Sequence, residues 1–369
     1  MTAAPARFGS YPAEDVTWLL TDLSGVDLER DTDERERAIQ SGTHYSEMLP
    51  VEYQPDAAYL DLFAQALEVS ADRVATAVGV VGELIHRRPT AAGRPPVLVS
   101  LARAGTPIGV LLRRYLAAAH GLDVAHYTIS IIRGRGIDEV ALAHILEAHP
   151  AAAVVFVDGW TGKGAIQREL TAAVGDWVRD HPEHADLDPT LAVLADPGGC
   201  TTLYGTRDDF LIPSACLNST VSGLVSRTVY RQDLIGSGMF HGAKFYAEWA
   251  DEDLSCHFVD TIAARFAGVR ETIAAEVAGH DGGPVTWAGQ QVVEALAAEH
   301  GITDINLVKP GVGETTRVLL RRVPWKVLVN PERLEDLRHV VALAQARGVP
   351  VVPTEGLPYS CVGLIRQVR

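Results

Sequence analysis

The sequence predicts an α/β protein: a parallel β-sheet covered by helices on both faces, followed by a small α/β/α sandwich. Three observations support this. Short, uninterrupted apolar runs alternate with helical segments from residue 97 to residue 194, as in buried parallel strands. A Gly-Gly-Pro break at 282–284 interrupts this pattern, which restarts after it. A chain of 369 residues with 47% hydrophobic content is also long enough to bury two cores.

The elements of the larger part follow in order. Residues 1–55 are mixed and acidic, and we expect an N-terminal extension with some helix. Helical spacing of apolar residues predicts a helix over 59–88, which Pro89 ends. Strands are predicted at 97–99, 127–132, 154–157 and 190–194, with helices at 108–119, 139–148 and from 165 onward. We therefore expect a sheet domain over 56–282.

The C-terminal part, 283–369, repeats the alternation on a smaller scale. Helices are predicted at 287–299, 314–322 and 332–347, and strands at 305–308, 326–329 and 349–352. A last apolar run lies at 361–365. This order predicts a separate small α/β/α domain.

Composition excludes several classes of protein. No apolar run approaches the roughly 20 residues that cross a bilayer, and the first ten residues lack the order of a secretory signal. We therefore expect a cytoplasmic protein. The four cysteines are widely spread and form no CxxC pair, which argues against a zinc knuckle and a disulfide framework.

Charge is unevenly distributed along the chain. The net charge of -15 argues against a general nucleic-acid binder. Residues 301–369, however, contain ten Lys and Arg against six Asp and Glu. A basic C-terminal piece on an acidic body suggests separate roles for the two regions.

The loop after the strand at 154–157 is the most informative segment for chemistry. It reads Asp158-Gly159-Trp160-Thr161-Gly162-Lys163-Gly164 and opens a helix. Loops at the carboxyl ends of parallel strands bind ligands, and small residues at a helix N-terminus let backbone N–H groups approach a phosphate. Val157 and Gly164 stand where a Walker P-loop needs Gly and Ser or Thr. Phosphate binding is favoured, with a plain strand–helix turn as the alternative.

Two earlier loops also suit anions. Ser100-Leu101-Ala102-Arg103-Ala104-Gly105 joins a strand to a helix and adds a fixed positive charge. Arg133-Gly134-Arg135-Gly136 places two guanidinium groups on a hinge-rich segment that could close over a charged group. A tight crossover and a solvated surface loop are the respective alternatives.

In this order the three loops resemble those of type I phosphoribosyltransferases. The resemblance implies that fold and a transferase that binds phosphoribosyl pyrophosphate together with Mg²⁺, the metal being held through pyrophosphate and water with no protein ligands. It implies catalytic roles for Asp158, which would hold the ribose hydroxyls, and for Arg133 and Arg135, which would close over pyrophosphate. The family usually has a second acid where Gly159 stands. The implied ligand-binding residues are Ser100, Leu101, Ala102, Arg103, Ala104, Gly105, Asp158, Gly159, Thr161, Gly162, Lys163 and Gly164.

Three longer strings, at 44–50, 214–228 and 240–246, carry a narrower resemblance. They are similar to phosphoribosyltransferases of tellurite-resistance and stress-response operons, some of which are described as StiP cysteine proteases. This implies synthesis of a ribosylated stress metabolite from a small, base-like acceptor. The string at 214–228 is rich in hydroxyls and amides, which suits the edge of a heterocycle, or else a polar-lined crossover. The acceptor-binding residues expected there are Cys216, Asn218, Ser219 and Arg227.

The string Lys309-Pro310-Gly311-Val312-Gly313-Glu314-Thr315-Thr316-Arg317 resembles the Pelota-type, L7Ae-like RNA-binding fold. Its glycines let backbone approach RNA, a carboxylate can accept from a base edge, and an arginine can pair with phosphate. The resemblance implies RNA binding by Gly311, Gly313, Glu314 and Arg317, and a plain docking domain is the alternative. Gly313 stands where kink-turn binders commonly have Asn.

Two other hypotheses come from different classes of function. The first is a cysteine peptidase with Cys216 as nucleophile and His241 or His257 as base. The second is a non-catalytic nucleotide sensor that reports through an RNA-binding tail. For the transferase we expect phosphoribosyl pyrophosphate, a small acceptor and RNA as binding partners. We expect no association with a membrane, and we expect a homodimer.

Overall fold

The computed structural model of the chain describes residues 8–52, 54–88, 94–150, 153–280 and 282–366. Its centre is a six-stranded sheet in which every strand is parallel to its neighbours. The spatial order is β1 (Thr17–Trp18), β6 (His126–Ile129), β5 (Pro96–Leu101), β9 (Ala153–Trp160), β10 (Leu191–Ala195) and β11 (Leu203–Thr206). The predicted parallel sheet is confirmed, and β1 and β11 are added to the four strands that the sequence indicates.

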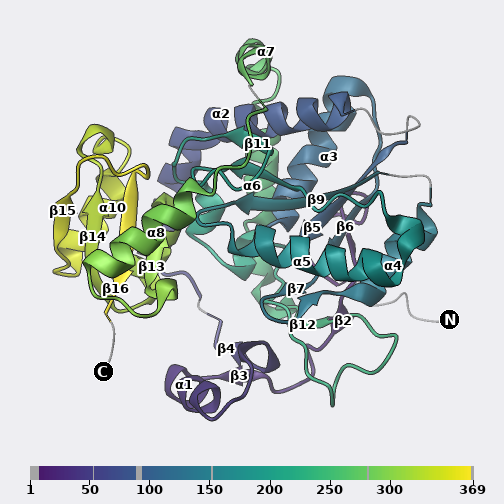
Figure 1. Cartoon of the computed structure of the whole chain (residues 1–369), viewed down its shortest axis with the longest axis horizontal. Coiled ribbons are helices and arrows are strands. Elements are labelled where there is room, and N and C mark those ends of the chain that lie inside the picture. The colour runs from purple at the N-terminus through teal and green to yellow at the C-terminus, as the bar shows by residue number, and fades with distance from the viewer. Residues whose placement is uncertain (1–7, 53, 89–93, 151–152, 281, 367–369) are drawn as a thin grey trace.

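Helices cover both faces of this sheet (Figure 1). α2 (Ala57–Arg87) and α3 (Thr106–His120) pack on one face, and α4 (Glu139–Ala148) and α5 (Ala165–Asp180) on the other. Along β9, Val155 and Val157 enter the core under α2 and α3, whereas Val154 and Phe156 enter the opposite core. A strand buried on both faces is apolar at every position, which is why uninterrupted apolar runs predict this sheet.

Residues 8–50 are part of this architecture through β1. β2 (Thr21–Asp22) pairs with β12 (Gly242–Ala243), and β3 (Glu29–Arg30) pairs with β4 (Leu49–Pro50). The expected helix content is α1 (Thr32–Gln40), which Asp31 caps by accepting from the backbone N–H of Glu34, and the 3₁₀ turn η1 (Tyr45–Glu47). The division of the chain at residues 55 and 282 stays a prediction.

The segment between β11 and the next helix has little regular structure. It contains the 3₁₀ turns η3 (Pro213–Ala215), η4 (Ser219–Val221) and η5 (Ala247–Glu252). α6 (Ser255–Ala263) and α7 (Arg270–Gly279) follow and pack against α2. The predicted strand at 127–132 is divided between β6 and β7 (Ile131–Ile132), which forms a short hairpin with β8 (Gly136–Ile137).

The C-terminal unit, residues 282–366, is built on a four-stranded mixed sheet. Its strands are ordered β13 (Val308–Pro310), β16 (Cys361–Ile365), β14 (Pro324–Val329) and β15 (Val351–Pro353), and β16 is antiparallel to both neighbours. The helices are α8 (Ala288–Glu299), α9 (Val312–Arg321) and α10 (Arg338–Ala346). The helix predicted over 332–347 begins late, because a 3₁₀ turn at Pro331–Arg333 precedes α10. The strand predicted at 305–308 likewise begins at Val308, after a 3₁₀ turn at Ile305–Leu307.

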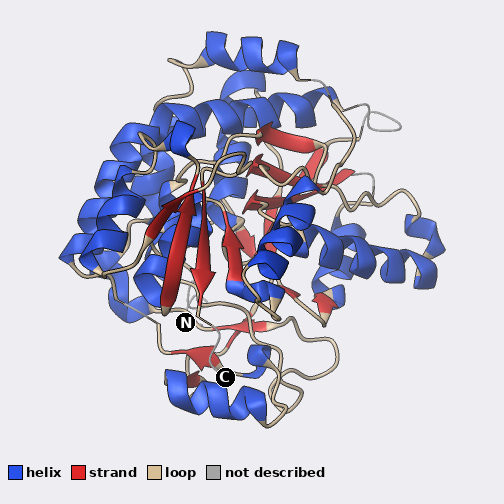
Figure 2. Cartoon of the chain, turned by 60° about the vertical axis from the view of Figure 1, so that its left-hand side comes forward, coloured by secondary structure: helices blue, strands red, loops and turns tan. Residues whose placement is uncertain are grey.

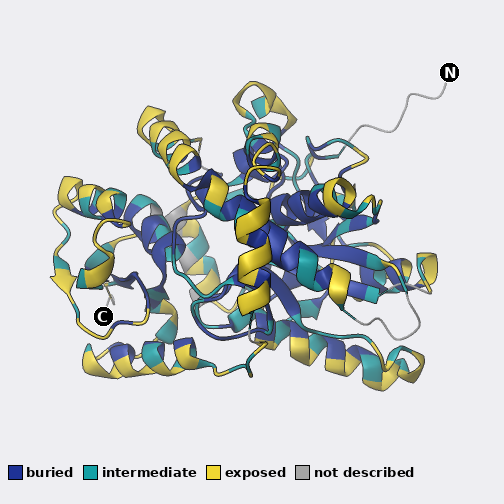
Figure 3. Cartoon of the chain, turned by 90° about the horizontal axis from the view of Figure 1, so that it is seen from above, coloured by how far each residue is buried: buried dark blue, intermediate teal, exposed yellow. Residues whose placement is uncertain are grey.

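Figure 2 shows the two sheets in one molecule. One apolar cluster extends across both units. The largest apolar cluster joins Val312, Leu319 and Val340 of the C-terminal unit to Phe210 and Ala215 of the sheet unit. Seen from above, buried residues run through both parts while exposed residues occupy the outer helix faces (Figure 3). None of the helices in the described ranges combines the length and apolar character that a membrane crossing needs.

Candidate functional site

A charged cleft lies where the carboxyl ends of β5 and β9 meet α9. It encloses about 420 Å³, and parallel sheets bind ligands at this end of their strands. Loops from the sheet unit form one wall and the C-terminal unit forms the other. The lining residues are Leu101, Ala102, Arg103, Ala104, Ile131, Asp158, Ile166, Asn218, Arg227, Lys309, Glu314, Arg317, Val318 and Arg322.

The loop after β5 contributes four of its six predicted residues to the cleft. Leu101 to Ala104 line it, whereas Ser100 is fully buried and its Oγ contacts His126 Nε2 at 2.7 Å and donates to the carbonyl of Gly105. A Cβ on Gly105 would lie 2.4 Å from the carbonyl oxygen of Val157, so only glycine fits there. Ser100 and Gly105 therefore hold the loop in place and do not face the cleft.

Arg103 is fixed by a residue that sequence reasoning missed. Its Nη1 donates to Glu52 Oε1 at 2.8 Å and to the carbonyl of Val225 at 3.2 Å. Glu52 is buried and also accepts from the backbone N–H of Ser219 at 3.0 Å. Glu52 lies just after the string at 44–50. A single carboxylate next to a motif belongs to no recognisable pattern of spacing, so the sequence does not indicate its role.

The loop after β9 divides between the cleft and a smaller cavity of about 250 Å³. Asp158 lines the cleft, and burial raises the pKa of its carboxyl to about 6, against the opposing hydrogen bond from Gly159 and the charge of Arg317. Thr161 to Gly164 line the smaller cavity, and the hydroxyl of Thr161 donates to Asp196. The two cavities share Lys309 and Glu314.

Lys163 faces other cations in the smaller cavity. Its Nζ donates to the carbonyl of Ile305 at 2.9 Å. Burial, together with the nearby charges of Lys309 and Arg133, lowers the pKa of Lys163 to about 8. An anion bound here would relieve that repulsion.

The predicted arginine loop is the turn of the β7–β8 hairpin, and its two guanidinium groups separate. Arg133 is exposed and lines the smaller cavity. Arg135 turns instead toward the N-terminal segment, where it pairs with Glu47 and donates to the carbonyl of Tyr230 at 2.8 Å. Only Arg133 is therefore placed to reach a ligand in these cavities.

The string at 214–228 contributes two of its four predicted residues to the wall. Asn218 and Arg227 line the cleft, whereas Cys216 and Ser219 are fully buried beneath it. Arg227 donates to the carbonyls of Tyr45 and Met48 at 3.1 and 3.0 Å. Burial lowers the pKa of its guanidinium to about 10, which leaves it charged at neutral pH.

Three of the four cysteines lie in surroundings that favour the protonated thiol. Burial raises the pKa of Cys200 to about 12, and it also raises the pKa values of Cys256 and Cys361. Of the two histidines expected as a base, His241 places its Nδ1 2.9 Å from Ser130 Oγ and its backbone N–H on Asp138. His257 is exposed on α6.

The glycine-rich string of the C-terminal unit faces inward, against the sheet unit. Gly311 has a φ of +92° beside Asp209, and a Cβ on Gly313 would lie 3.3 Å from Ala215. The guanidinium carbon of Arg317 lies 4.9 Å from the ring centre of Trp160. Glu314 lies 3.4 Å from Arg317 and 3.8 Å from Lys309. Residues of the basic region and of the acidic body thus line one cleft, and separate roles for the two regions stay a prediction.

Asp209 attaches this string to the sheet unit. Its carboxylate accepts from the backbone N–H groups of Val312 and Ser360, both at 2.8 Å. Ser360 Oγ donates to the carbonyl of Asp209, and the Tyr359 hydroxyl donates to the carbonyl of Gly162. Because Asp209 is more than 100 residues from its partners, nothing local in the sequence could indicate this docking.

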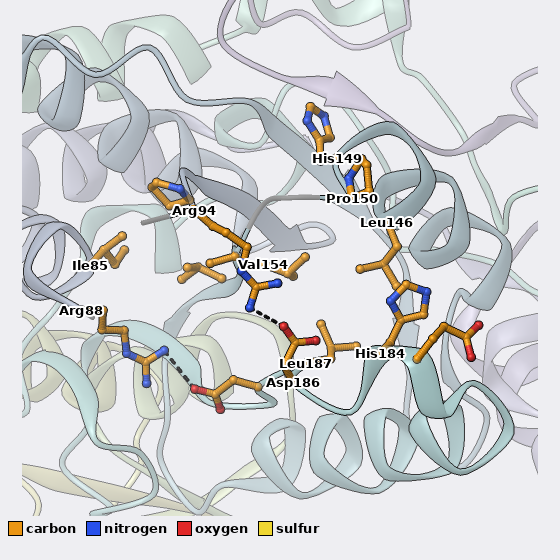
Figure 4. Close-up of a pocket in the computed structure, with 15 residues that line it drawn as sticks. Ile85, Arg88, Arg94, Leu146, His149, Pro150, Val154, His184, Asp186 and Leu187 are labelled. Carbon is orange, nitrogen blue, oxygen red and sulfur yellow. Dashed lines mark hydrogen bonds and ion pairs between the residues drawn. The ribbon is translucent and has the colours of Figure 1, made fainter. Parts of the chain in front are cut away.

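A second large cavity, of about 570 Å³, lies at the opposite end of the sheet (Figure 4). Arg94 pairs with Asp186 there, and Arg88 with Asp188 at 3.1 Å. It adjoins the amino ends of β5 and β9, where parallel sheets do not usually bind ligands. The carboxyl-end cleft is therefore the candidate site. Within the described residues, no group of three or more His, Cys, Asp or Glu side chains is arranged to hold a metal ion.

Comparison with known proteins finds two matching families. Residues 9–263 match the family described as tellurite-like stress resistance cysteine protease StiP, and residues 287–367 match the PELOTA RNA-binding domain. The chain is 38% identical over 372 residues to a curated protein from Acinetobacter baylyi named cysteine protease StiP, covering 98% of this chain and 94% of that protein.

A solved alanine–glyoxylate aminotransferase from Nostoc sp. shares 15% identity and covers 99% of this chain and 92% of its own, with a TM-score of 0.19. A score this low carries no argument. The predicted phosphoribosyltransferase activity, by contrast, is wrong, because the family match and the curated relative both name a cysteine protease. The prediction failed because the order of the three loops indicates only that one end of the sheet suits anions. The same arrangement of loops can serve unrelated reactions.

Proposed function

Because the chain belongs to the family of tellurite-like stress resistance cysteine proteases StiP, we propose that it is a cysteine protease. The observation that supports this is 38% identity to a protein of that name across nearly the whole chain. The family match spans 9–263 and therefore contains Cys200, Cys216 and Cys256, while Cys361 lies outside it. The nucleophile belongs to the first three.

Cys216 is the best placed of the three. Its neighbour Asn218 lines the cleft, and Ala215 lies 3.3 Å from the position that a Cβ on Gly313 of the opposite wall would take. Cys216 itself is fully buried, so a peptide reaches it only when the residues that cover it move.

The reaction follows from the chemistry of a thiol. The thiolate attacks the peptide carbonyl carbon, the amine leaves with a proton, and water hydrolyses the resulting thioester. His241 is a candidate base because a neutral imidazole can accept the thiol proton, and burial, which lowers its pKa, makes it a weaker base than a free imidazole. Its pairing with Cys216, like that of His257, stays a prediction.

The test is hydrolysis of a denatured protein substrate by the full chain, before and after iodoacetamide. We expect thiol-dependent cleavage, and we expect Cys216→Ser to lower it by roughly 1,000-fold or more. Cys361→Ser is the matched control, since this cysteine is also buried but lies outside the family match. Activity that survives both iodoacetamide and Cys216→Ser would reject the assignment.

We also propose that the C-terminal unit binds RNA. The support is the PELOTA match over 287–367, which contains Gly311, Gly313, Glu314 and Arg317. That the larger sheet has the type I phosphoribosyltransferase fold stays a prediction and brings none of that family's chemistry with it. Mg²⁺, a homodimer and a cytoplasmic location likewise stay predictions.

A further inference from the structure

The cleft is basic although the chain is acidic. Five cationic side chains line it against two carboxylates, in a protein of net charge -15. Arg103 and Arg227 come from the sheet unit, and Lys309, Arg317 and Arg322 from the C-terminal unit. The adjoining cavity adds Arg133 and Lys163. Such a local excess of one charge in a confined site attracts polyanions.

The RNA-suited string does not lie on a free surface. A Cβ on Gly313 would lie 3.3 Å from Ala215 and 3.5 Å from the Trp160 ring, and the Arg317 guanidinium lies over that ring. Any RNA that reaches Glu314 or Arg317 in this arrangement must therefore enter between the two units. It would meet the β5 and β9 loops at the same time.

The size of the space restricts the form of the RNA. The two adjoining cavities hold about 420 and 250 Å³, which is the scale of a small-ligand site. A duplex is far too wide for such a site, whereas the unpaired end of a strand fits. Recognition of single-stranded RNA typically combines cations that follow the backbone with aromatic faces and contacts to the 2′-hydroxyl.

We propose that this cleft is a composite site for the single-stranded end of an RNA, held by both units at once. Arg103, Arg133 and Lys163 contact phosphates, and the Asp158 carboxylate accepts from a ribose 2′-hydroxyl. The inference rests on the proposed RNA binding by the C-terminal unit and adds that the sheet unit forms half of the site.

Photocrosslinking with the full chain tests the composite site directly. The probe is a ten-nucleotide oligouridylate with 4-thiouridine at its 3′ end, with adducts mapped by mass spectrometry. We expect adducts in peptides from both walls, including the loops around Arg103 or Lys163. Adducts confined to residues 287–367 would overturn the composite site and leave RNA binding by the C-terminal unit intact. Failure of the wild-type chain to bind any RNA would instead reject the proposed RNA function.

Variants in the sheet unit supply a second measurement. Arg133→Gln alters an exposed side chain, and Arg179→Gln is the matched control on α5, where Arg179 is 67% exposed and pairs with Asp176. For Arg133→Gln we expect weaker binding of the oligouridylate and a salt dependence shallower by about 0.7 in log–log slope, the value for one phosphate contact on a single strand. An unchanged slope would count against the composite site.

Asp158→Ala separates a ribose contact from a structural role. We expect it to bring the affinities for oligouridylate and for the matching DNA strand closer together, because the 2′-hydroxyl distinguishes the two. Equal weakening of both affinities would show that Asp158 only supports the wall. Equal binding of the wild-type chain to the oligouridylate and to its duplex would overturn the single-strand assignment.

Discussion

At the amino ends of β5 and β9, Arg88 and Arg94 each lie against an aspartate, whereas at the carboxyl ends of the same strands the cations outnumber the carboxylates. Both cavities are large and charged. In the first, each of these two arginines pairs with an aspartate that lines the same cavity. In the second, burial shifts the pKa of Asp158 toward its neutral form, and in the smaller cavity that adjoins it burial does the same for Lys163. Titratable groups with shifted pKa values in a cleft mark a candidate functional site.

The largest effect we expect comes from the rim of the cleft. Gly105→Ala would place a Cβ 2.4 Å from a backbone carbonyl of β9, so the sheet or the loop must shift. We expect a loss of about 3 kcal/mol in the free energy of unfolding. Urea denaturation measures it, with Gly175→Ala as the control, because nothing lies within 4 Å of that position on α5. The control should be neutral or stabilising by up to about 1 kcal/mol, and equal losses in both variants would contradict the argument.

A smaller effect of opposite sign is expected at Asp158. The folded carboxyl has a pKa of about 6 against an ordinary value of 3.8, so its ionised form destabilises the fold at neutral pH. Asp158→Asn should therefore raise the free energy of unfolding at pH 7 by about 1–2 kcal/mol. The gain should disappear as the pH falls from about 6 to about 4, since the folded wild-type carboxyl then takes up its proton. A variant that is less stable than wild type at pH 7 would contradict this account.

The smallest effect is expected from the matching change at the other end of the sheet. Asp186→Asn removes the charged partner of Arg94, whose hydrogen bond lowers the pKa of the Asp186 carboxyl. The stabilisation is present above the ordinary pKa and is lost as pH falls through the lowered value. Because Asp186 is more than half exposed, we expect a loss below about 1 kcal/mol at pH 7. Thermal unfolding of wild type and variant, at pH 7 and at a pH below the lowered pKa, checks this expectation. A variant that is more stable than wild type at pH 7 would remove the contrast between the two cavities.

The sequence predicts the sheet well where burial imposes a pattern. β5, β9 and β10 are apolar throughout because helices cover both faces. β1 was missed because Thr17 and Trp18 are too few to show a period, and β11 because Gly205 interrupts a four-residue strand. The spacing of apolar residues therefore does not reveal strands as short as these two.

The site was predicted in part. Loops that directly follow strands must lie at the rim, so Arg103 and Asp158 are where the topology puts them. The pairing of Arg103 with Glu52, and the inward face of Glu314 and Arg317, depend on contacts between distant segments. The enzyme class was wrong for a different reason, because the same rim can serve unrelated reactions.

The apolar cluster that runs from Phe210 into Val312 and Val340 has a consequence for how the molecule melts and how it can be cut. Because these residues pack across the boundary between the two units, heat should unfold both units together, as one calorimetric peak whose van't Hoff and calorimetric enthalpies agree. Truncation near residue 282 would leave Phe210 and Ala215 without their cover, and the shortened chain should aggregate. Exchange of the C-terminal unit between relatives would then succeed only when the residues of the sheet unit that contact it are exchanged as well.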